Sequence, residues 1–535
     1  MATDGADRLS ELPDDLLRRI LRFAPLREAA STTALSRRWR APLWRSSGAL
    51  NLETGNLKRY YDNPRFFTRR DDFVSAAVRA LGAADVPVTR LTLRLESDLQ
   101  ERLGDFDSWY RDTSLDKVVS RFTDLVDVVL SHPAARRVEE LRVVAEHRRD
   151  HYSRTHDQRG LYMLTLDSVQ LETIHVLELT HCKGLLHQRQ KADVLLLPRL
   201  SSLRLSSCVQ QLSALQSVID AAPALATLHL EFVLINASSS NEEPTTRRLR
   251  CPAATMLVLD SCSWEEETQC RHSSGYNYKK MVDVHAVEMD APRLRRFRYK
   301  GPLLSFSFSQ QPSELDQVDL DFSGKKNKDP EPEHDLAASF WPFTRSFTST
   351  KEMRLRVNNL EDIALLSEAR RAELLPAAFR RLERLEVQAG ADLNKGKAAA
   401  MAILNLLRCC PVLSALRIIL TAEHAEASSN KKGAPSCTRI AQKEIQIAAL
   451  AQCHLFQCLQ RSLRRVGLQF QLEKSNCLGV KLIKFFAENA MVLEEMYVDG
   501  GDEKLCEHMN PKTEKWNSKR RKSGATCFVV LPLKR

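Results

Sequence analysis

Long apolar runs are absent from this 535-residue sequence, and glycine and proline are sparse, at 18 and 21 residues. The best apolar stretch, residues 410–420, is short and contains Arg417, so we expect no membrane span. The low glycine and proline contents exclude collagen-like and low-complexity chains. The first residues carry two acids and no apolar segment, so we expect no secretory signal.

Motifs for common catalytic and cofactor chemistry are also absent. The sequence has no G-x-x-x-x-G-K-[ST] phosphate loop, no G-x-S-x-G nucleophile elbow and no C-x-x-C pair. The grouping of Cys453, His454 and Cys458 lacks the spacing of zinc ligands. We therefore expect a protein that is not an enzyme and that holds no metal and no cofactor.

Cysteine usage and charge limit the compartment and the partners. The 13 cysteines are an odd number, which indicates reduced thiols in a cytoplasmic or nuclear protein rather than a disulfide framework. Lys and Arg outnumber Asp and Glu by 79 to 68, a formal net charge of +11. This excess is compatible with nucleic acid, with an acidic protein partner, or simply with a soluble surface. No nucleic-acid reading motif accompanies it, so nucleic acid is the less favoured partner.

A repeated frame, apolar-x-x-L-x-L-x-x-C, runs through the middle of the chain. Four copies begin their strands at Leu177, Leu203, Leu228 and Leu257, which are 25 to 29 residues apart. Leucine-rich repeats have units of roughly 20–29 residues. The L-x-L part predicts a short strand with both leucines buried and the middle residue exposed. The Cys is predicted to be buried and to pack as a small apolar residue. Weaker copies extend from Leu91 to Val498, and helical spacings separate some strands, at residues 122–130, 212–222 and 401–409.

Residues 8–46 differ in kind from the repeats. Pro13 suits the first position of a helix, in which Leu16, Leu17, Ile20 and Leu21 are expected to form one apolar face. A second short helix is expected after Pro25 and a third from Leu35 onwards. Three short helices make too small a core for a robust independent domain, so we expect a partner to cover them.

The order of landmarks in this segment resembles an F-box, the motif that binds the SKP-type adaptor of cullin-based ubiquitin ligases. The matching residues are Leu12-Pro13, Ile20-Leu21, Glu28, the run from Leu35 to Trp39, and Leu43-Trp44. Ala24 stands where a larger apolar residue is common, and Pro42 looks like an insertion that would kink the third helix. The rival interpretation is an amphipathic cap on the repeat array.

The carboxy-terminal region resembles the closing segment of plant F-box proteins that combine leucine-rich repeats with an FBD-type region. Residues 480–498 predict a helix followed by a strand, and residues 527–530 a final strand. We predict an α/β fold with a small three-helix F-box at 8–46 and a helical linker at 47–87. An irregular leucine-rich-repeat solenoid, or horseshoe, follows at 88–420, then a loop at 421–440 and terminal repeats with an FBD-like cap at 441–535.

The resemblance implies a non-catalytic substrate receptor of an SCF (SKP–cullin–F-box) E3 ubiquitin ligase, which captures a protein for ubiquitination and proteasomal degradation. The alternative is a basic leucine-rich-repeat scaffold for nucleic acid or chromatin with a vestigial F-box. The residues expected to bind the adaptor are Leu12, Pro13, Ile20, Leu21, Leu35 and Trp39. The residues expected to contact a substrate lie between strand leucines: Glu178, Arg204, His229, Val258, Arg298, Arg356, Glu386 and Arg417. Four of these eight are arginines, which hints at an acidic or phosphorylated target, although ordinary solvated strand positions explain them equally well.

Overall fold

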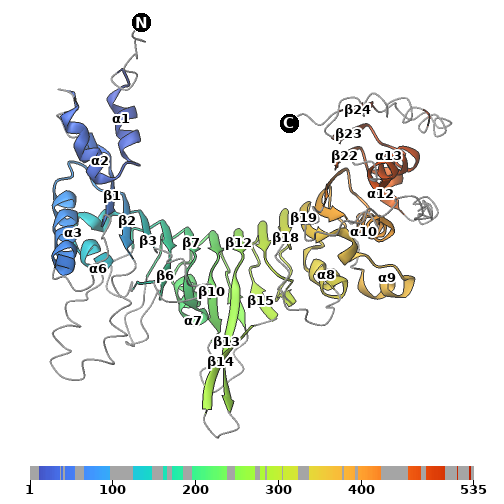
Figure 1. Cartoon of the computed structure of the whole chain (residues 1–535), viewed down its shortest axis with the longest axis horizontal. Coiled ribbons are helices and arrows are strands. Elements are labelled where there is room, and N and C mark those ends of the chain that lie inside the picture. Colours follow the sequence, from blue (N-terminus) through green and yellow to red (C-terminus); the bar gives the residue numbers. More distant parts are fainter. Residues whose placement is uncertain are drawn as a thin grey trace, which may run out of the picture. The chain divides into compact units, whose positions relative to one another are not determined.

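The computed structural model contains the whole chain (Figure 1). The chain divides into two compact units. The first unit comprises Met1–Ala254 and Ser261–Val284, and the second comprises Thr255–Asp260 and His285–Arg535. The structure describes residues 11–35, 38–39, 43–54, 65–96, 125–146, 161–164, 172–184, 196–237, 247–271, 277–283, 286–303, 305–322, 336–375, 379–391, 396–422, 456–470, 477–499, 515 and 529–531.

The first unit begins with short helices. They are α1 (Asp14–Leu21), α2 (Leu26–Ser31), and the 3₁₀ helices η1 (Thr32–Ala34) and η2 (Leu43–Ser46). Pro13 and Pro25 directly precede α1 and α2, where a fixed φ and a missing N–H cost nothing. The first two predicted helices are therefore confirmed. The prediction of a third helix opening at Leu35 is wrong for the described residues, because Leu35 lies in a turn and η2 is a single 3₁₀ turn. Pro42 lies outside the described residues.

A parallel sheet follows in the first unit, and each of its strands pairs with the strand of this sheet that comes next along the chain. Its strands are β1 (Ala49–Glu53), β2 (Arg90–Glu96), β3 (Glu140–Glu146), β5 (Val176–Thr180), β7 (Ser202–Ser206) and β9 (Thr227–Glu231). The register aligns the first strand leucines, which are all buried, from β2 to β9. Period-2 burial of these leucines confirms the predicted strands. The predicted helical linker at 47–87 is wrong in part, because β1 already belongs to the sheet, whereas α3 (Arg65–Gly82) is helical as expected.

The first unit also contains a second sheet. Its order is β14-β13-β10-β8-β6-β4, formed by β4 (Tyr162–Met163), β6 (Cys182–Lys183), β8 (Val209–Gln211), β10 (Leu234–Ala237), β13 (Ser263–Arg271) and β14 (Asn277–Asp283). In this sheet β6, β8 and β10 follow the turns that end β5, β7 and β9. The turn residues His181, Ser207, Phe232 and Ser261 all have φ between 51° and 55°, the left-handed region. Each is followed by a buried small residue, Cys182, Cys208, Val233 or Cys262, which explains the last position of the repeated frame.

Other elements of the first unit lie between these strands. They are α6 (Leu125–Leu130), η3 (Pro133–Arg137), α7 (Leu212–Asp220) and β11 (Arg248–Arg250). The helices α6 and α7 confirm the predictions at 122–130 and 212–222 within the described residues. The long antiparallel pair β13 and β14 follows no signal that we read in the sequence.

The second unit contains a parallel sheet of the same kind. Its strands, in order, are β12 (Met256–Asp260), β16 (Arg296–Lys300), β18 (Gln317–Asp321), β19 (Glu352–Asn359), β20 (Arg384–Ala391), β21 (Ala415–Ala422), β22 (Arg465–Phe470), β23 (Glu495–Asp499) and β24 (Val529–Leu531). They confirm the weaker L-x-L predictions in this part of the chain, and β24 overlaps the predicted final strand.

Helices and two further strands accompany this second sheet. They are α8 (Leu336–Thr344), η4 (Arg345–Phe347), η5 (Leu360–Ile363), α9 (Glu368–Leu374), α10 (Gly396–Cys409), α12 (Gln457–Arg461), α13 (Cys477–Asn489), β15 (Ala286–Asp290) and β17 (Ser305–Phe308). The predicted helices at 401–409 and before Met496 correspond to α10 and α13. In the part of the chain that the structure describes, no helix has the length and apolar character needed to cross a membrane.

A main-chain hydrogen-bond ladder connects successive parallel strands just before many of them begin. The carbonyl of Gly48 accepts from the N–H groups of Thr89 and Arg90, at 2.9 and 3.2 Å. The carbonyl of Thr89 in turn accepts from Glu139 and Glu140. The same two-to-one pattern recurs in the second unit, for example at Arg295 and Asp316. Because the ladder uses only main-chain groups, the sequence between the leucines is free to vary.

Candidate adaptor-binding face and strand face

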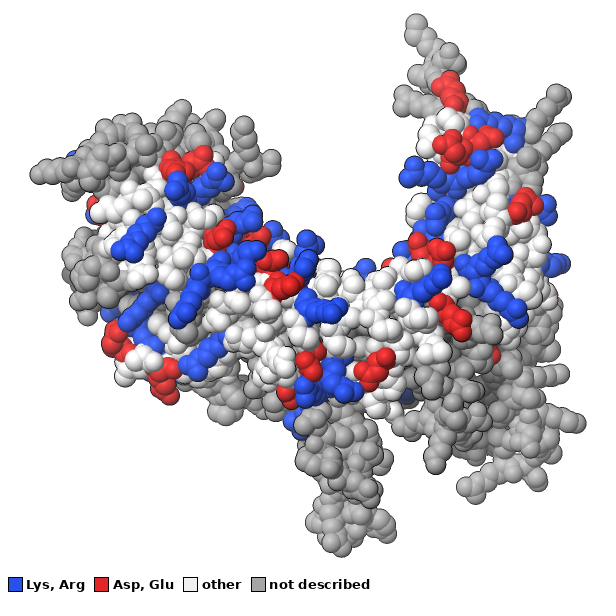
Figure 2. All heavy atoms as spheres, turned by 180° about the vertical axis from the view of Figure 1, so that it is seen from behind, with Lys and Arg blue, Asp and Glu red and all other residues white. Residues whose placement is uncertain are grey.

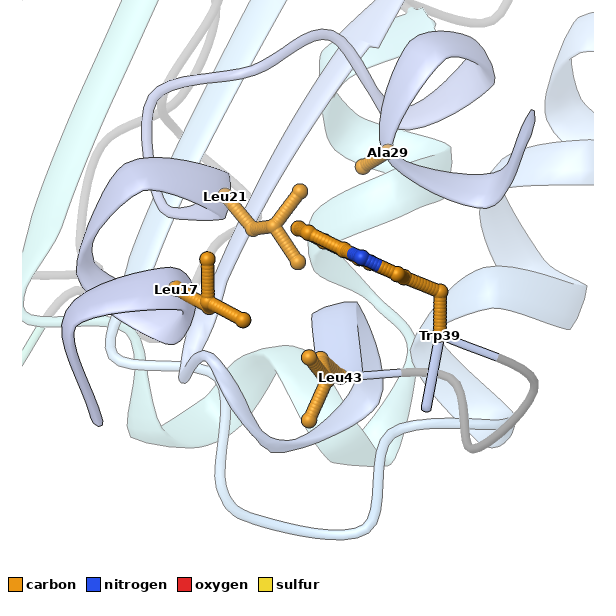
Figure 3. Close-up of a cluster of buried hydrophobic side chains, with 5 residues drawn as sticks. All are labelled: Leu17, Leu21, Ala29, Trp39 and Leu43. Carbon is orange, nitrogen blue, oxygen red and sulfur yellow. The ribbon is translucent and has the colours of Figure 1, made fainter. Parts of the chain in front are cut away.

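The N-terminal helices enclose a small apolar core of their own. Leu17, Leu21, Ala29, Trp39 and Leu43 point toward one another (Figure 3), and the partly buried Leu12, Ala24 and Trp44 pack against them. The predicted adaptor residues Leu21 and Trp39 are only 5% and 7% exposed. Their side chains thus support the surface from within, and their contact with an adaptor stays a prediction.

Other apolar side chains of this region face outward. Leu16, Ile20, Phe23 and Leu35 are 37%, 48%, 66% and 69% exposed. The spacing i, i+4, i+7 places the first three along one side of α1 and its end. The prediction of a single apolar face on α1 is wrong, because Leu17 and Leu21 point inward whereas Leu16 and Ile20 point outward. We call Leu16, Ile20, Phe23 and Leu35 the adaptor face. The sequence analysis missed Leu16 and Phe23, which their helical spacing from Ile20 could have revealed.

The start of α1 is fixed by a residue from the far end of the motif. Arg38 donates to a carboxylate oxygen of Asp14 at 2.6 Å and also to the carbonyl of Leu12. Pro13, a predicted adaptor residue, is exposed beside this contact. The ion pair holds the Leu12-Pro13 corner against the end of the motif.

The N-terminal helices are also attached to the first strands of the sheet. The side-chain amide of Asn51 in β1 donates to the carbonyls of Arg22 and Ala24 at 3.0 and 2.9 Å. The guanidinium of Arg90 in β2 lies over the ring of Phe23, 4.6 Å from its centroid. The end of α1 is therefore anchored to β1 and β2.

The exposed side of each parallel sheet forms a second candidate site, which we call the strand face. In the first unit, the register brings Glu178, Arg204 and His229 side by side on β5, β7 and β9, as the repeated frame predicted. Arg142 on β3 extends this row, and the sequence analysis missed it. Arg142 lies between the strand residues Leu141 and Val143, so the same repeated frame could have revealed it.

In the second unit, Val258, Arg298, Glu386 and Arg417 also lie in one row, but the register between Arg298 and Glu386 passes through Asp319 and Arg354. The predicted Arg356 lies two residues further along β19, in a row with Asp321 and Gln388. Val258 is only 3% exposed, contrary to the exposed position expected between strand leucines, so it offers little surface to a partner.

Charges on the strand face of the first unit are paired between neighbouring strands. Arg142 lies 3.0 Å from Glu178, and Arg204 lies 2.9 Å from Glu231. The hydrogen bond from Arg204 lowers the pKa of Glu231 below its usual range, with help from the charge of Arg204 and His229 against a smaller opposing effect of burial. The neighbouring carboxylates therefore neutralise part of the positive charge of these arginines.

The second unit shows the same pairing. Arg298 lies 3.8 Å from Asp319, Arg417 lies 3.6 Å from Glu386, and Arg356 lies 2.9 Å from Asp321. Burial raises the pKa of Asp319, although Arg298 opposes the shift. Figure 2 shows the result on the visible described surface, where Lys and Arg side chains are interspersed with Asp and Glu.

Cysteines and metal-binding groups add no further site among the described residues. Cys182, Cys208, Cys251, Cys262, Cys409, Cys410 and Cys458 are free and buried. Burial raises the pKa of Cys409 and of Cys458 to about 12, so neither forms a thiolate readily near neutral pH. The described part of the chain contains no group of three or more His, Cys, Asp or Glu able to hold a metal ion.

Comparison with known proteins identifies the N-terminal segment. The F-box domain model matches residues 9–41. The chain is 33% identical over 112 residues to an FBD-associated F-box protein of Arabidopsis thaliana, covering 20% of this chain and 23% of that protein. It is 36% identical over 89 residues to an F-box/LRR-repeat protein of the same plant, covering 17% and 19%. It is 37% identical over 112 residues to a meiotic F-box protein of Oryza sativa subsp. japonica, covering 20% and 23%. The chain thus spans less than a quarter of the length of each of these relatives, and the resemblance read from the sequence is confirmed.

Proposed function

We propose, from the premise that this chain is a plant-type F-box protein related to FBD-associated and F-box/LRR-repeat proteins, that it is the substrate receptor of an SCF E3 ubiquitin ligase. The observation that carries this proposal is the adaptor face. Four large apolar side chains are exposed on a helical segment whose own core is already filled by Leu17, Leu21 and Trp39. Exposed apolar residues in such a group mark an interaction site, and an F-box generally binds a SKP-type adaptor.

We further propose that the two parallel sheets are leucine-rich repeats. Support comes from strands that pair in chain order, from buried leucines in register, and from the main-chain ladder that recurs at strand starts in both units. In the first unit the left-handed turn also recurs after β5, β7 and β9. A repeat array of this kind offers a long exposed strand face for a protein partner.

The strand face is proposed to hold the substrate while its lysines meet a ubiquitin-charged conjugating enzyme bound elsewhere in the ligase. The chain then acts by proximity, because it raises the effective concentration of the acceptor lysine without contributing a catalytic group. Glu178, Arg204, His229, Arg298, Arg356, Glu386 and Arg417 remain the proposed contacts, joined by Arg142, Asp319 and Arg354. The pairing of arginines with carboxylates along the strand face favours a protein partner of mixed charge over nucleic acid, because the carboxylates reduce the positive potential that a run of phosphates needs. We place this activity in the cytoplasm or nucleus.

Capture of a SKP-type adaptor by the full chain tests the proposal. An Ile20→Asp/Leu35→Asp variant places charge on the adaptor face and should lose capture while its circular dichroism and melting midpoint stay unchanged. Leu366 in the second unit is similarly exposed, at 59%, so Leu366→Asp is the matched control and should bind normally. No capture by the wild-type chain with any of several adaptor paralogues would contradict the proposal, as would equal capture by the double variant.

A further inference from the structure

Three arginines gather where the N-terminal helices meet the first strands. Arg22 directly follows α1, and its carbonyl is bound by Asn51 of β1. Arg90 begins β2, and Arg142 lies on β3, diagonal to Arg90 in a register that pairs Arg90 with Glu140. Three separate elements therefore bring these arginines to one junction of the first unit. Burial, Arg142 and Arg22 all lower the pKa of Arg90, with Glu140 and Glu178 opposing, as expected for neighbouring cations.

Two carboxylates face these three cations. Glu140 lies 3.6 Å from Nε of Arg90, and Glu178 lies 3.0 Å from Nε of Arg142. Arg22 has no ion pair with any described residue. Arg90 is 8% exposed and covered on one side by the ring of Phe23. A largely buried guanidinium with an incomplete counter-charge is costly, and an added anion would lower that cost.

The hydrogen-bonding state of the three groups agrees with this deficit. The Nε atoms of Arg22, Arg90 and Arg142 are buried and have no hydrogen-bond acceptor among the described residues. The oxygen of Glu178 lies close to Arg142 Nε but is not aligned with the N–H. Buried donors are paired in the great majority of native structures, so three orphaned donors in one cluster call for an acceptor.

We propose that Arg22, Arg90 and Arg142 form a binding site for a small phosphate-type dianion. Two of the side chains remain accessible, because Arg142 is about one-third exposed and Arg22 is half-buried. Their guanidinium forks match the paired oxygens of phosphate, and Arg90 beneath them adds positive potential. A bound anion would touch both the end of α1 and the strands β2 and β3, so it would hold the F-box on the strand face.

The test is a titration of the full chain with inorganic phosphate, following the melting midpoint at constant ionic strength with chloride as the balancing anion. We expect a saturable rise in the midpoint with phosphate that chloride does not reproduce, because an anion bound to the native state alone stabilises it. Parallel titrations with sulfate and with a phosphate monoester such as ribose 5-phosphate identify the source. Tighter binding of the monoester indicates an organic phosphate, and equal binding indicates the free anion.

Arg22→Gln should weaken phosphate binding at least tenfold and, because it removes like-charge repulsion, should not lower the midpoint measured in chloride. Arg142→Gln should weaken binding as well and serves as a second, independent variant. Arg94→Gln is the matched control, since Arg94 lies on β2 and pairs with Glu53 at 3.1 Å, and this variant should keep the phosphate response. A wild-type chain without a saturable response, or the same response in Arg22→Gln and Arg142→Gln as in the wild type, would overturn the site. Both of these outcomes concern the phosphate site alone, and neither would contradict adaptor binding by the F-box.

Discussion

The side-chain amide of Asn51 donates a hydrogen bond of 2.9 Å to the main-chain carbonyl of Ala24. The same amide donates a second bond, of 3.0 Å, to the carbonyl of Arg22. Carbonyls at the end of a helix have no partner within it, and here one strand residue satisfies two of them. The junction between the F-box and the first strand is thus a specific polar contact rather than a simple chain connection.

Replacing Asn51 by Ala should therefore destabilise the first unit by about 1–3 kcal/mol, the cost of leaving buried polar groups without a partner. Asn51→Asp should cost more, because a carboxylate cannot donate to a carbonyl. Urea unfolding measures the change. Asn489, whose amide bonds the carbonyl of Phe485 within the same helix at 2.8 Å, provides the control, and Asn489→Ala should have a smaller effect. Equal effects of the two Ala variants would argue against the anchoring role.

Trp39 and Leu35 should show opposite behaviour, although both were expected to contact the adaptor. Trp39 is buried in the F-box core, so Trp39→Ala should cost about 3–5 kcal/mol in the free energy of unfolding. Leu35 is exposed, so Leu35→Ala should leave stability within about 0.5 kcal/mol and weaken adaptor binding. Chemical denaturation of each variant measures its free energy of unfolding, and titration with the adaptor measures its binding. A Trp39→Ala variant that keeps wild-type stability but does not bind would mean that Trp39 contacts the adaptor directly.

The left-handed turn at Ser207 predicts a stabilising substitution. Its φ of 52° is costly for a residue with a Cβ, and glycine adopts it freely, so Ser207→Gly should stabilise the protein by up to about 1 kcal/mol. The main-chain bond from Ser207 N to the carbonyl of Glu231 is kept. Ser202→Gly, at the start of β7, should destabilise by about 0.5–1 kcal/mol because glycine weakens a strand. Melting midpoints that rank these variants in the reverse order would contradict the turn assignment.

Glu231 predicts a pH-dependent contribution to stability. Its pKa is lowered in the folded state, first by the hydrogen bond from Arg204. A depressed carboxyl pKa stabilises the fold above the unfolded value, near 4.5, and this contribution is lost as the pH falls through the folded pKa. Because both side chains of the pair are partly exposed to solvent, we expect only about 0.2–1 kcal/mol.

Urea unfolding of wild type and Glu231→Gln between pH 3 and pH 7 tests this contribution. The wild type should be more stable at pH 7, and the difference should shrink below about pH 4.5. Asp220 pairs with Arg250 at 3.1 Å in the same unit, and both side chains are about half exposed, so Asp220→Asn is the control for an ordinary surface ion pair. A difference that stays constant over the whole pH range would show that Glu231 acts only through packing.

The strands could be predicted from the sequence because alternating burial is a local pattern, but their register could not, because it depends on distant partners. Met353, Leu355 and Val357 on β19 form two overlapping pairs of apolar residues at i and i+2. Only the pairing of β19 with β20 shows that Arg354, not Arg356, aligns with Glu386. Strand β1 was missed although its sequence carries Leu50-x-Leu52.

The adaptor face was predicted incompletely for a similar reason. The helix α1 is apolar on two sides, and the sequence does not tell which side the protein buries itself and which it leaves for a partner. Leu17 and Leu21 meet Trp39, which comes from a distant part of the motif, and this contact leaves Leu16 and Ile20 outside. Helical periodicity alone defines the two sides but not their partners.

The described cysteines predict a clear chemical result. Cys409, Cys410 and Cys458 are buried, and burial raises the pKa of each thiol, so they should resist alkylation by iodoacetamide at pH 8. Cys208 is an instructive contrast, because a hydrogen bond with Cys182 lowers its pKa. Since Cys208 is only 1% exposed, it should nevertheless stay unmodified until the first unit opens. Mass spectrometry of native and urea-treated protein, read peptide by peptide, measures this protection. Rapid native labelling of Cys208 together with protection of Cys409 would show that the first unit opens locally, whereas labelling of all four would contradict their role as packed core residues.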